Sequence, residues 1–148
     1  MTHTLRPMRP GDLARVEAIH RQLARAVSPA EWLPTATEAM DESRGTPLAW
    51  VAVAKRDRVI GYVIGQIRSW EFGSPPAGWV VGIGVDVEHQ HERAGAELLQ
   101  QLVASFAERG VTTIRTMVRR DDVKVLRFFR NAGFATGPYT ELEMEVSP

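Results

Sequence analysis

The feature that most constrains this chain is a nearly all-apolar run at residues 79–85, Trp-Val-Val-Gly-Ile-Gly-Val. An unbroken apolar run of this length is typical of a strand that is buried on both faces. A helical spacing of large apolar residues follows it: Leu98, Leu99, Leu102, Val103 and Phe106. This spacing predicts a helix over residues 93–109, which Gly110 ends. The chain must therefore build layers of helix around a central strand.

Strand and helix patterns alternate along the rest of the chain. Further helices are expected over residues 12–27, 29–43 and 122–132. Further strands are expected over residues 2–8, 49–54, 59–68, 111–118 and 141–146. Ser28 is the expected N-cap of the second helix, and His20 is expected on the polar face of the first. The order of elements indicates a mixed α/β fold.

Length and composition restrict the class of protein further. The 148 residues, 44% hydrophobic and 24% charged, fit one soluble globular domain, which we expect to span residues 1–148. The 18 basic and 18 acidic residues balance, whereas nucleic-acid-binding proteins normally carry a basic excess. The absence of Cys excludes disulfides and cysteine nucleophiles, and it favours a cytoplasmic location. We see no signal peptide and no apolar run of about 20 residues, so we expect no membrane association.

Three segments, taken in order, resemble the GNAT superfamily of N-acetyltransferases. Residues 5–13, Leu-Arg-Pro-Met-Arg-Pro-Gly-Asp-Leu, resemble its opening strand and helix start. Residues 85–99 resemble its acyl-CoA loop, V-x-P-x-x-(R/Q)-x-x-G-x-(G/A)-x-x-L-L. Residues 122–134 resemble its late helix, N-x-x-A-x-x-F-Y-x-x-x-G-F. The resemblance implies a GNAT-like fold, a twisted mixed β-sheet with helices on both faces, and transfer of an acetyl group from acetyl-CoA to an amine.

The acyl-CoA loop also has a physical rationale, because a turn that leads from a strand into a helix favours a phosphate through backbone amides and the helix dipole. The resemblance implies CoA contacts from the strand end, the loop and the late helix: Ile83, Gly84, Val85, Gln90, His91, Glu92, Arg93, Ala94, Gly95, Ala96, Asp122 and Phe129. Among these, Gln90, Arg93 and Gly95 are the leading candidates for phosphate contacts.

Among the departures from the family patterns, four bear on CoA binding or catalysis. Val87 replaces the loop proline. Arg93 replaces the first loop glycine, where its guanidinium either pairs with a phosphate or is a solvated helix residue. Asp122 replaces Asn, and Phe129 replaces a Tyr that is proposed to protonate the leaving thiolate in many family members. A non-catalytic CoA-binding or regulatory protein therefore stays open as an alternative, with a small α/β interaction domain as a third.

The groups that transfer protons are less well defined by the sequence. The amine must lose a proton to a carboxylate or a His, often through a water. The candidates for this base are Glu71 and Asp86, with Glu38 or Asp41 as further choices if the second helix covers the site. Tyr139, which follows Gly-Pro, is a candidate for an alternative acid.

Other polar residues indicate a function less clearly. His89 and His91 form an H-x-H arrangement, but we expect no metal because no third ligand lies at suitable spacing. The basic segment 109–130 is either a solvated face or the source of a contact to the CoA 3′-phosphate, from Arg119, Arg120 or Lys124. We therefore expect acetyl-CoA as co-substrate, a small-molecule or protein amine as acceptor, no nucleic acid, and a monomer or homodimer.

Overall fold

The computed structural model describes residues 3–23, 29–90 and 92–148. The chain forms two compact units, a larger one that runs to Met117 and a smaller one from Val118 to Pro148. The expected N-cap Ser28 and the loop residue His91 lie outside the described residues. None of the helices in the described part of the chain combines the length and the apolar character that a membrane span requires.

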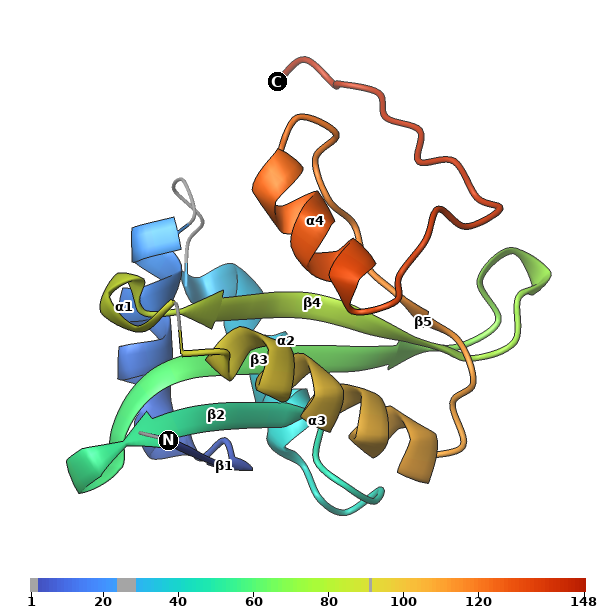
Figure 1. The fold of residues 1–148 in the computed structure, drawn as a ribbon. Coiled ribbons are helices and arrows are strands. Elements are labelled where there is room, and N and C mark those ends of the chain that lie inside the picture. The colour runs from blue at the N-terminus through green and yellow to red at the C-terminus, as the bar shows by residue number, and fades with distance from the viewer. Residues whose placement is uncertain (1–2, 24–28, 91) are drawn as a thin grey trace. The chain divides into compact units, whose positions relative to one another are not determined.

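A five-stranded sheet in the order β1-β2-β3-β4-β5 forms the centre of the larger unit (Figure 1). Its strands are β1 (Thr4–Pro7), β2 (Ala49–Ala54), β3 (Arg58–Arg68), β4 (Ala77–Val85) and β5 (Ile114–Arg115). The first four strands pair antiparallel, and β5 pairs parallel to β4. The expected mixed sheet is confirmed, although β5 is much shorter than the predicted strand 111–118.

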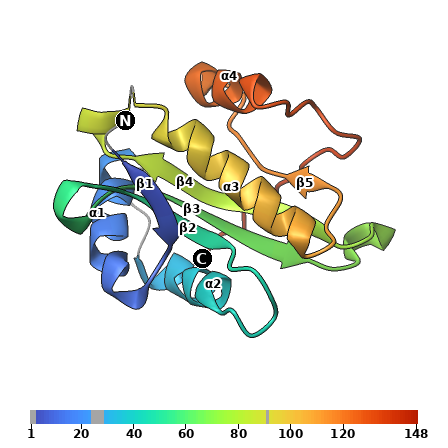
Figure 2. The same cartoon turned by 60° about the horizontal axis from the view of Figure 1, so that its bottom comes forward.

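Helices cover both faces of this sheet, as the resemblance implied (Figure 2). The helices of this unit are α1 (Leu13–Leu23), α2 (Pro29–Met40) and α3 (Ala94–Glu108). A Cβ added to Gly65 would lie 2.6 Å from the Phe106 ring, so β3 and α3 approach closely on one face. On the other face, a Cβ added to Gly84 would lie 2.7 Å from Cδ1 of Leu23 in α1. The glycines on β3 and β4 therefore permit the close packing of helices and sheet.

The apolar spacing that predicted α3 is the face that the helix buries. Leu98, Leu99, Leu102 and Phe106 are each at most 1% exposed. Gly110 ends the helix with φ +78°, a conformation that glycine adopts without strain. The amides of Gly110 and Val111 donate to the carbonyls of Ala107 and Phe106, which is the Schellman pattern. The predicted start and end of this helix are therefore correct to within one residue.

The opening segment links β1 to the start of α1 through one side-chain cluster. Arg6 on β1 donates two hydrogen bonds to the carboxylate of Asp12, at 2.8 and 2.9 Å. The same carboxylate accepts from the backbone amide of Arg9 at 2.8 Å. Asp12 is buried, and a buried charge is stable only when it is paired in this way. The Arg6–Asp12 pair therefore fixes the turn between the first strand and the first helix.

The smaller unit contains α4 (Val123–Asn131), which begins and ends as the sequence predicts. The Asp122 side chain caps its start by accepting from the Val125 amide at 3.1 Å. Gly133, at φ +102°, ends it with the same Schellman pattern as α3, and Phe134 donates its amide to the Phe129 carbonyl. The rings of Phe129 and Phe134 meet edge to face at 5.2 Å, the apolar contact that commonly accompanies this cap.

The prediction of a strand over residues 141–146 is wrong, because the structure forms no ladder there. The alternating residues Leu142, Met144 and Val146 are 89%, 84% and 79% exposed. Alternation describes which face a strand would bury, but a strand also requires a partner that accepts its hydrogen bonds. The sequence pattern alone contains no information about that partner.

Candidate functional site

A β-bulge lies in the middle of β4. The register pairs Ile64 with Gly82 and then Gly65 with Val80, so Val81 is an extra residue on β4. One extra residue inverts the alternation of side chains along a strand. Accordingly a Cβ at Gly78 would lie 2.8 Å from Phe106 of α3, whereas one at Gly84 would lie 2.9 Å from Tyr62 on the face of α1. Beyond the bulge, β4 therefore presents glycine backbone to the α1 face.

Past the same point β4 also loses its neighbour β5. Only Gly78 and Trp79 pair with β5. The Thr116 hydroxyl then donates to the Val80 carbonyl at 3.0 Å. From Val81 onward, no strand of the described residues pairs with this edge of β4. The two strands therefore diverge, which leaves a strand edge whose backbone groups are available to a ligand.

The loop after β4 is held by its own hydrogen bonds and by contacts with α1 and β3. Asp86 donates its amide to the Ile60 carbonyl at 2.8 Å and accepts from the Glu88 amide at 3.0 Å. A single 3-10 turn, Val87–His89, follows. The Val87 amide donates to Oε1 of Gln22 on α1 at 3.2 Å. A proline at position 87 would lack this amide hydrogen, so the departure from the family pattern gives the loop an additional contact.

Asp86 holds the loop in place and is poorly suited to act as a base. It is 3% exposed and forms an ion pair with Arg15, which also donates to the Val59 carbonyl at 3.0 Å. Burial alone raises the pKa of Asp86, but the Glu88 amide and the Arg15 guanidinium outweigh it and lower the pKa below its ordinary value. A carboxylate with a lowered pKa is a weak proton acceptor. The sequence did not identify Arg15 as its partner.

Arg93 occupies the backbone conformation that explains the family glycine. It is the N-cap of α3 and has φ +61° and ψ +11°, in the left-handed region. L-residues other than glycine adopt this region at a cost of about 1–2 kcal/mol. The side chain of Arg93 is exposed. A glycine, which the family pattern has at this position, would adopt the same conformation without this strain.

The remaining loop residues surround the N-terminus of α3. Gln90 donates its side-chain amide to the Val85 carbonyl at 3.2 Å, which ties the loop to the end of β4. Nε2 of His89 lies 3.8 Å from a carboxylate oxygen of Glu92, an acid of the same loop. Ala94 is buried, and Gly95 and Ala96 are half-buried. The left-handed turn at Arg93 therefore leads directly into the first backbone amides of α3, a helix of 15 residues.

Half-buried His20 and buried Tyr62 form a pair beneath the bare backbone of β4. His20 is half-buried, and its Nδ1 lies 3.2 Å from the Tyr62 hydroxyl. The expectation that His20 occupies a polar face is therefore wrong. Burial raises the pKa of Tyr62 to about 12. A Cβ at Gly84 would lie 3.2 Å from this hydroxyl, so the pair supports the strand edge directly. The sequence offered no signal for it.

The other candidates for proton transfer lie on different elements, each described within its own unit. Glu71 is exposed in the turn that joins β3 to β4, at the opposite end of β4 from Asp86. Tyr139 is exposed in the smaller unit, which also contains Asp122 and the buried Phe129. Asp122 caps α4, and Phe129 packs against Phe134. The roles of these residues toward a ligand stay predictions.

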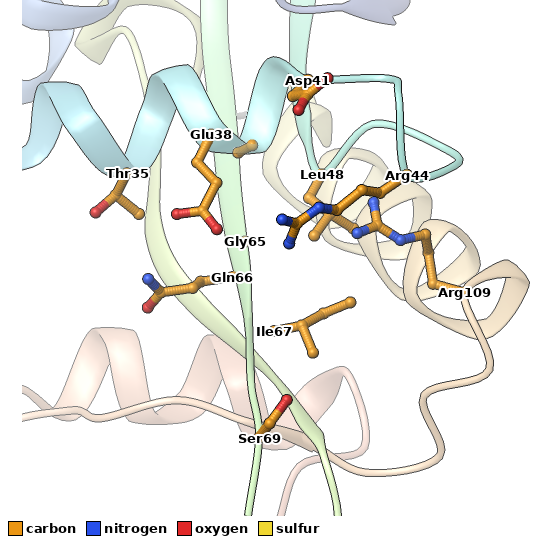
Figure 3. Close-up of a pocket in the computed structure, with 11 residues that line it drawn as sticks. Thr35, Glu38, Asp41, Arg44, Leu48, Gly65, Gln66, Ile67, Ser69 and Arg109 are labelled. Carbon is orange, nitrogen blue, oxygen red and sulfur yellow. The ribbon is translucent and has the colours of Figure 1, made fainter.

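Two acids of α2 and the loop that follows it line a pocket. The pocket has a volume of about 360 Å³ and lies between α2, its following loop, β3 and the end of α3 (Figure 3). Glu38 and Asp41 both contribute to its wall. Gln66 and Gly65 of β3 form another part of the lining. The helix α2 therefore covers part of the sheet at β3, and the role of these acids as a base stays a prediction.

The family of the chain follows from its sequence match. The model of the Acetyltransferase (GNAT) family matches residues 14–134, which is most of the chain. The chain belongs to this family. A search of curated proteins found no match.

Solved acetyltransferase structures share the fold. AAC(6')-Iy, solved with the bisubstrate analog CoA-S-monomethyl-acetylneamine, has a TM-score of 0.79 and 15% identity, covering 99% of this chain and 100% of that one. The aminoglycoside 6'-N-acetyltransferase AAC(6')-Ih from Acinetobacter baumannii has a TM-score of 0.76 and 15% identity, covering 98% and 99%. The ribosomal-protein-S18-alanine N-acetyltransferase from Escherichia coli has a TM-score of 0.73 and 19% identity, covering 91% and 79%. At these identities the similarity shows the GNAT fold.

Proposed function

We propose that this protein is an acetyl-CoA-dependent N-acetyltransferase that acts on a primary amine. The observation that carries the proposal is the left-handed turn at Arg93, which leads from the loop after the free edge of β4 into the N-terminus of α3. We place the CoA pyrophosphate at the loop 90–95, where the helix dipole favours an anion. We also propose that residues 1–148 act as one functional domain.

The reaction that we propose is a direct transfer. The neutral amine attacks the thioester carbonyl carbon, the C–N bond forms, the C–S bond breaks, and the sulfur leaves as CoA thiolate. The proton that the nitrogen loses passes to a base or to solvent. Backbone amides near Ile83, Gly84 and Val85 polarise the carbonyl, since preorganised N–H groups stabilise developing negative charge.

The thiolate can leave without a dedicated acid. A thiol has a pKa of about 8.5, so its conjugate base is a moderate leaving group in water. Positioned proton transfer contributes about 10²–10⁴-fold, which makes turnover slower but not impossible where Phe129 replaces Tyr. Tyr139 is our candidate for an alternative acid and Glu71 for a base. Asp86 has a positioning role through Arg15.

The test is release of free thiol from acetyl-CoA in the presence of a panel of primary amines. Turnover on at least one amine is expected. Gly95→Asp places a carboxylate against the proposed pyrophosphate position and should abolish acetyl-CoA binding in calorimetry, whereas unchanged affinity would contradict this placement. The second candidate is a CoA-binding protein without catalysis, which Phe129 and Arg93 favour. Tight acetyl-CoA binding with no thiol release from any amine would establish that alternative.

A further inference from the structure

The pocket described above adjoins the point at which β4 diverges from β5. Its floor includes Gly65 and Gln66, which pair with Val80 and Trp79 of β4. The next residue of β4 is Val81, the bulge. Neighbouring strands lie about 4.8 Å apart, so the floor of the pocket is one strand away from the bulge. A small molecule held there can extend an amine to the free edge of β4.

Two guanidinium groups occupy one side of this pocket. Figure 3 shows Arg44 and Arg109 beside each other, with their guanidinium groups in the same part of the pocket. Nη1 of Arg109 donates to the Thr46 carbonyl at 3.0 Å. A Cβ on Gly45 would lie 2.9 Å from Cδ of Arg109, so the loop packs against this side chain. Arg109 is therefore held in position before any ligand binds.

The nearby acid does not neutralise these two cations by direct pairing. The carboxylate of Asp41 accepts from the Ser43 amide at 2.9 Å and from the Ser43 hydroxyl at 3.0 Å. These hydrogen bonds lower the pKa of Asp41, and the charges of the nearby Arg44 and Arg109 lower it further, so the carboxylate stays ionised. Within the described residues, neither Arg44 nor Arg109 forms an ion pair.

The other side of the pocket is lined by hydrogen-bond acceptors and not by cationic donors. Figure 3 shows Glu38, Thr35 and Gln66 there, with the carboxylate of Glu38 pointing into the pocket. Carboxylate and amide oxygens accept hydrogen bonds from an ammonium or amine. The pocket thus has cationic donors at one side and acceptors at the other, within a volume of about 360 Å³. That volume lies in the range of small-molecule sites.

We infer that this pocket receives the acceptor and selects an amine that also carries a carboxylate. The carboxylate binds Arg44 and Arg109, because two guanidinium groups side by side offer charge-assisted hydrogen bonds to both of its oxygens. The amine end passes Glu38 and Gln66 toward β4. The inference rests on the proposed N-acetyltransferase function and names its acceptor class, an amino acid or a similar small zwitterion.

The experiment compares amines that differ only in the carboxylate. The pairs are lysine with 1,5-diaminopentane, ornithine with 1,4-diaminobutane, and phenylalanine with 2-phenylethylamine. For at least one pair we expect the acid to have a kcat/KM about tenfold or more above its partner, the value of a charge-assisted hydrogen bond. Arg44→Gln should remove this ratio by lowering kcat/KM for the acid alone. Arg58→Gln, at an exposed position on β3, is the matched control and should keep the ratio.

Equal kcat/KM values within every pair would overturn the inference, and so would an equal loss for both members in Arg44→Gln. Calorimetry with the same compounds separates this failure from failure of the proposed function. A parent protein that releases no thiol yet binds one of the three acids, with binding lost in Arg44→Gln, would support the pocket and refute the enzyme. A parent that binds none of the acids and turns over none of them would refute the pocket.

Discussion

The conformation of Arg93 leads to a prediction about stability that is separate from ligand binding. Arg93→Gly should raise the free energy of unfolding, because φ +61° is strained for Arg and not for Gly. Relief of this strain is worth about 1–2 kcal/mol. The greater backbone freedom of glycine in the unfolded chain offsets about 0.5–1 kcal/mol of it. We therefore expect a net gain of about 0.75 kcal/mol, the middle of a range of about 0–1.5 kcal/mol.

Urea unfolding of three variants tests this reasoning. Arg93→Ala keeps a Cβ and therefore keeps the strain, so its free energy of unfolding should stay close to that of the parent. Arg56, at φ +62° in the turn between β2 and β3, is the positive control, and Arg56→Gly should also stabilise. Arg58, at φ −79°, is the negative control, and Arg58→Gly should destabilise. If the Gly and Ala variants at position 93 unfold with the same free energy, the strain argument is wrong.

The same variants distinguish the effect of the backbone of residue 93 on acetyl-CoA binding from the effect of its charge. If the guanidinium contacts a phosphate, Arg93→Ala should weaken acetyl-CoA binding about tenfold or more, as expected for a charge-assisted hydrogen bond. Arg93→Gly should recover part of that loss, because glycine lets the backbone approach the pyrophosphate closely. Calorimetry with acetyl-CoA measures both. Unchanged affinity in Arg93→Ala would make Arg93 a surface residue.

Four further outcomes are expected. Asp86→Asn should lower the free energy of unfolding by about 2 kcal/mol. The folded-state pKa of Asp86 is lowered, so the stability that its carboxylate contributes is fully present above the unfolded-state pKa of about 3.9. This contribution is lost as the pH falls through the folded-state pKa. Gly84→Ala should destabilise by about 1–3 kcal/mol, since its Cβ would lie 2.9 Å from the Tyr62 ring, whereas Gly82→Ala, at 3.5 Å, should be close to neutral. Tyr62→Phe should remove the ultraviolet phenol transition near pH 12. Phe129→Tyr should fold and turn over no more slowly than the parent.

Each of these outcomes has a result that would contradict it. The free energies of unfolding of Asp86→Asn and the parent should become equal in acid. If they differ by the same amount down to low pH, the ion pair is not the cause of the difference. Equal stability of the two glycine variants in urea would contradict the packing argument on β4. If Tyr62→Phe keeps the ultraviolet phenol transition near pH 12, that transition belongs to another group. A slower Phe129→Tyr enzyme would show that the new hydroxyl disturbs the site.

Local signals in the sequence determined the helices and most of the strands. Helical spacing identified the buried face of α3, and Gly110 and Gly133 each marked a helix end because both adopt positive φ in a Schellman motif. The resemblance of residues 85–99 to the acyl-CoA loop located the candidate site. All of these signals lie within a few residues of one another. Backbone hydrogen bonds and side-chain periodicity at that range are properties of the local sequence.

The tertiary structure decided which distant residues meet. Arg15 pairs with Asp86, and His20 meets Tyr62, across 71 and 42 residues of chain, so no local pattern could predict either contact. The bulge at Val81 and the short β5 depend on how neighbouring strands align. The pocket that we propose for the acceptor is formed by α2, β3 and the end of α3. Packing determines such contacts, because the hydrophobic effect stabilises any arrangement that removes apolar surface from water. It does not depend on how far apart the contacting residues lie in the chain.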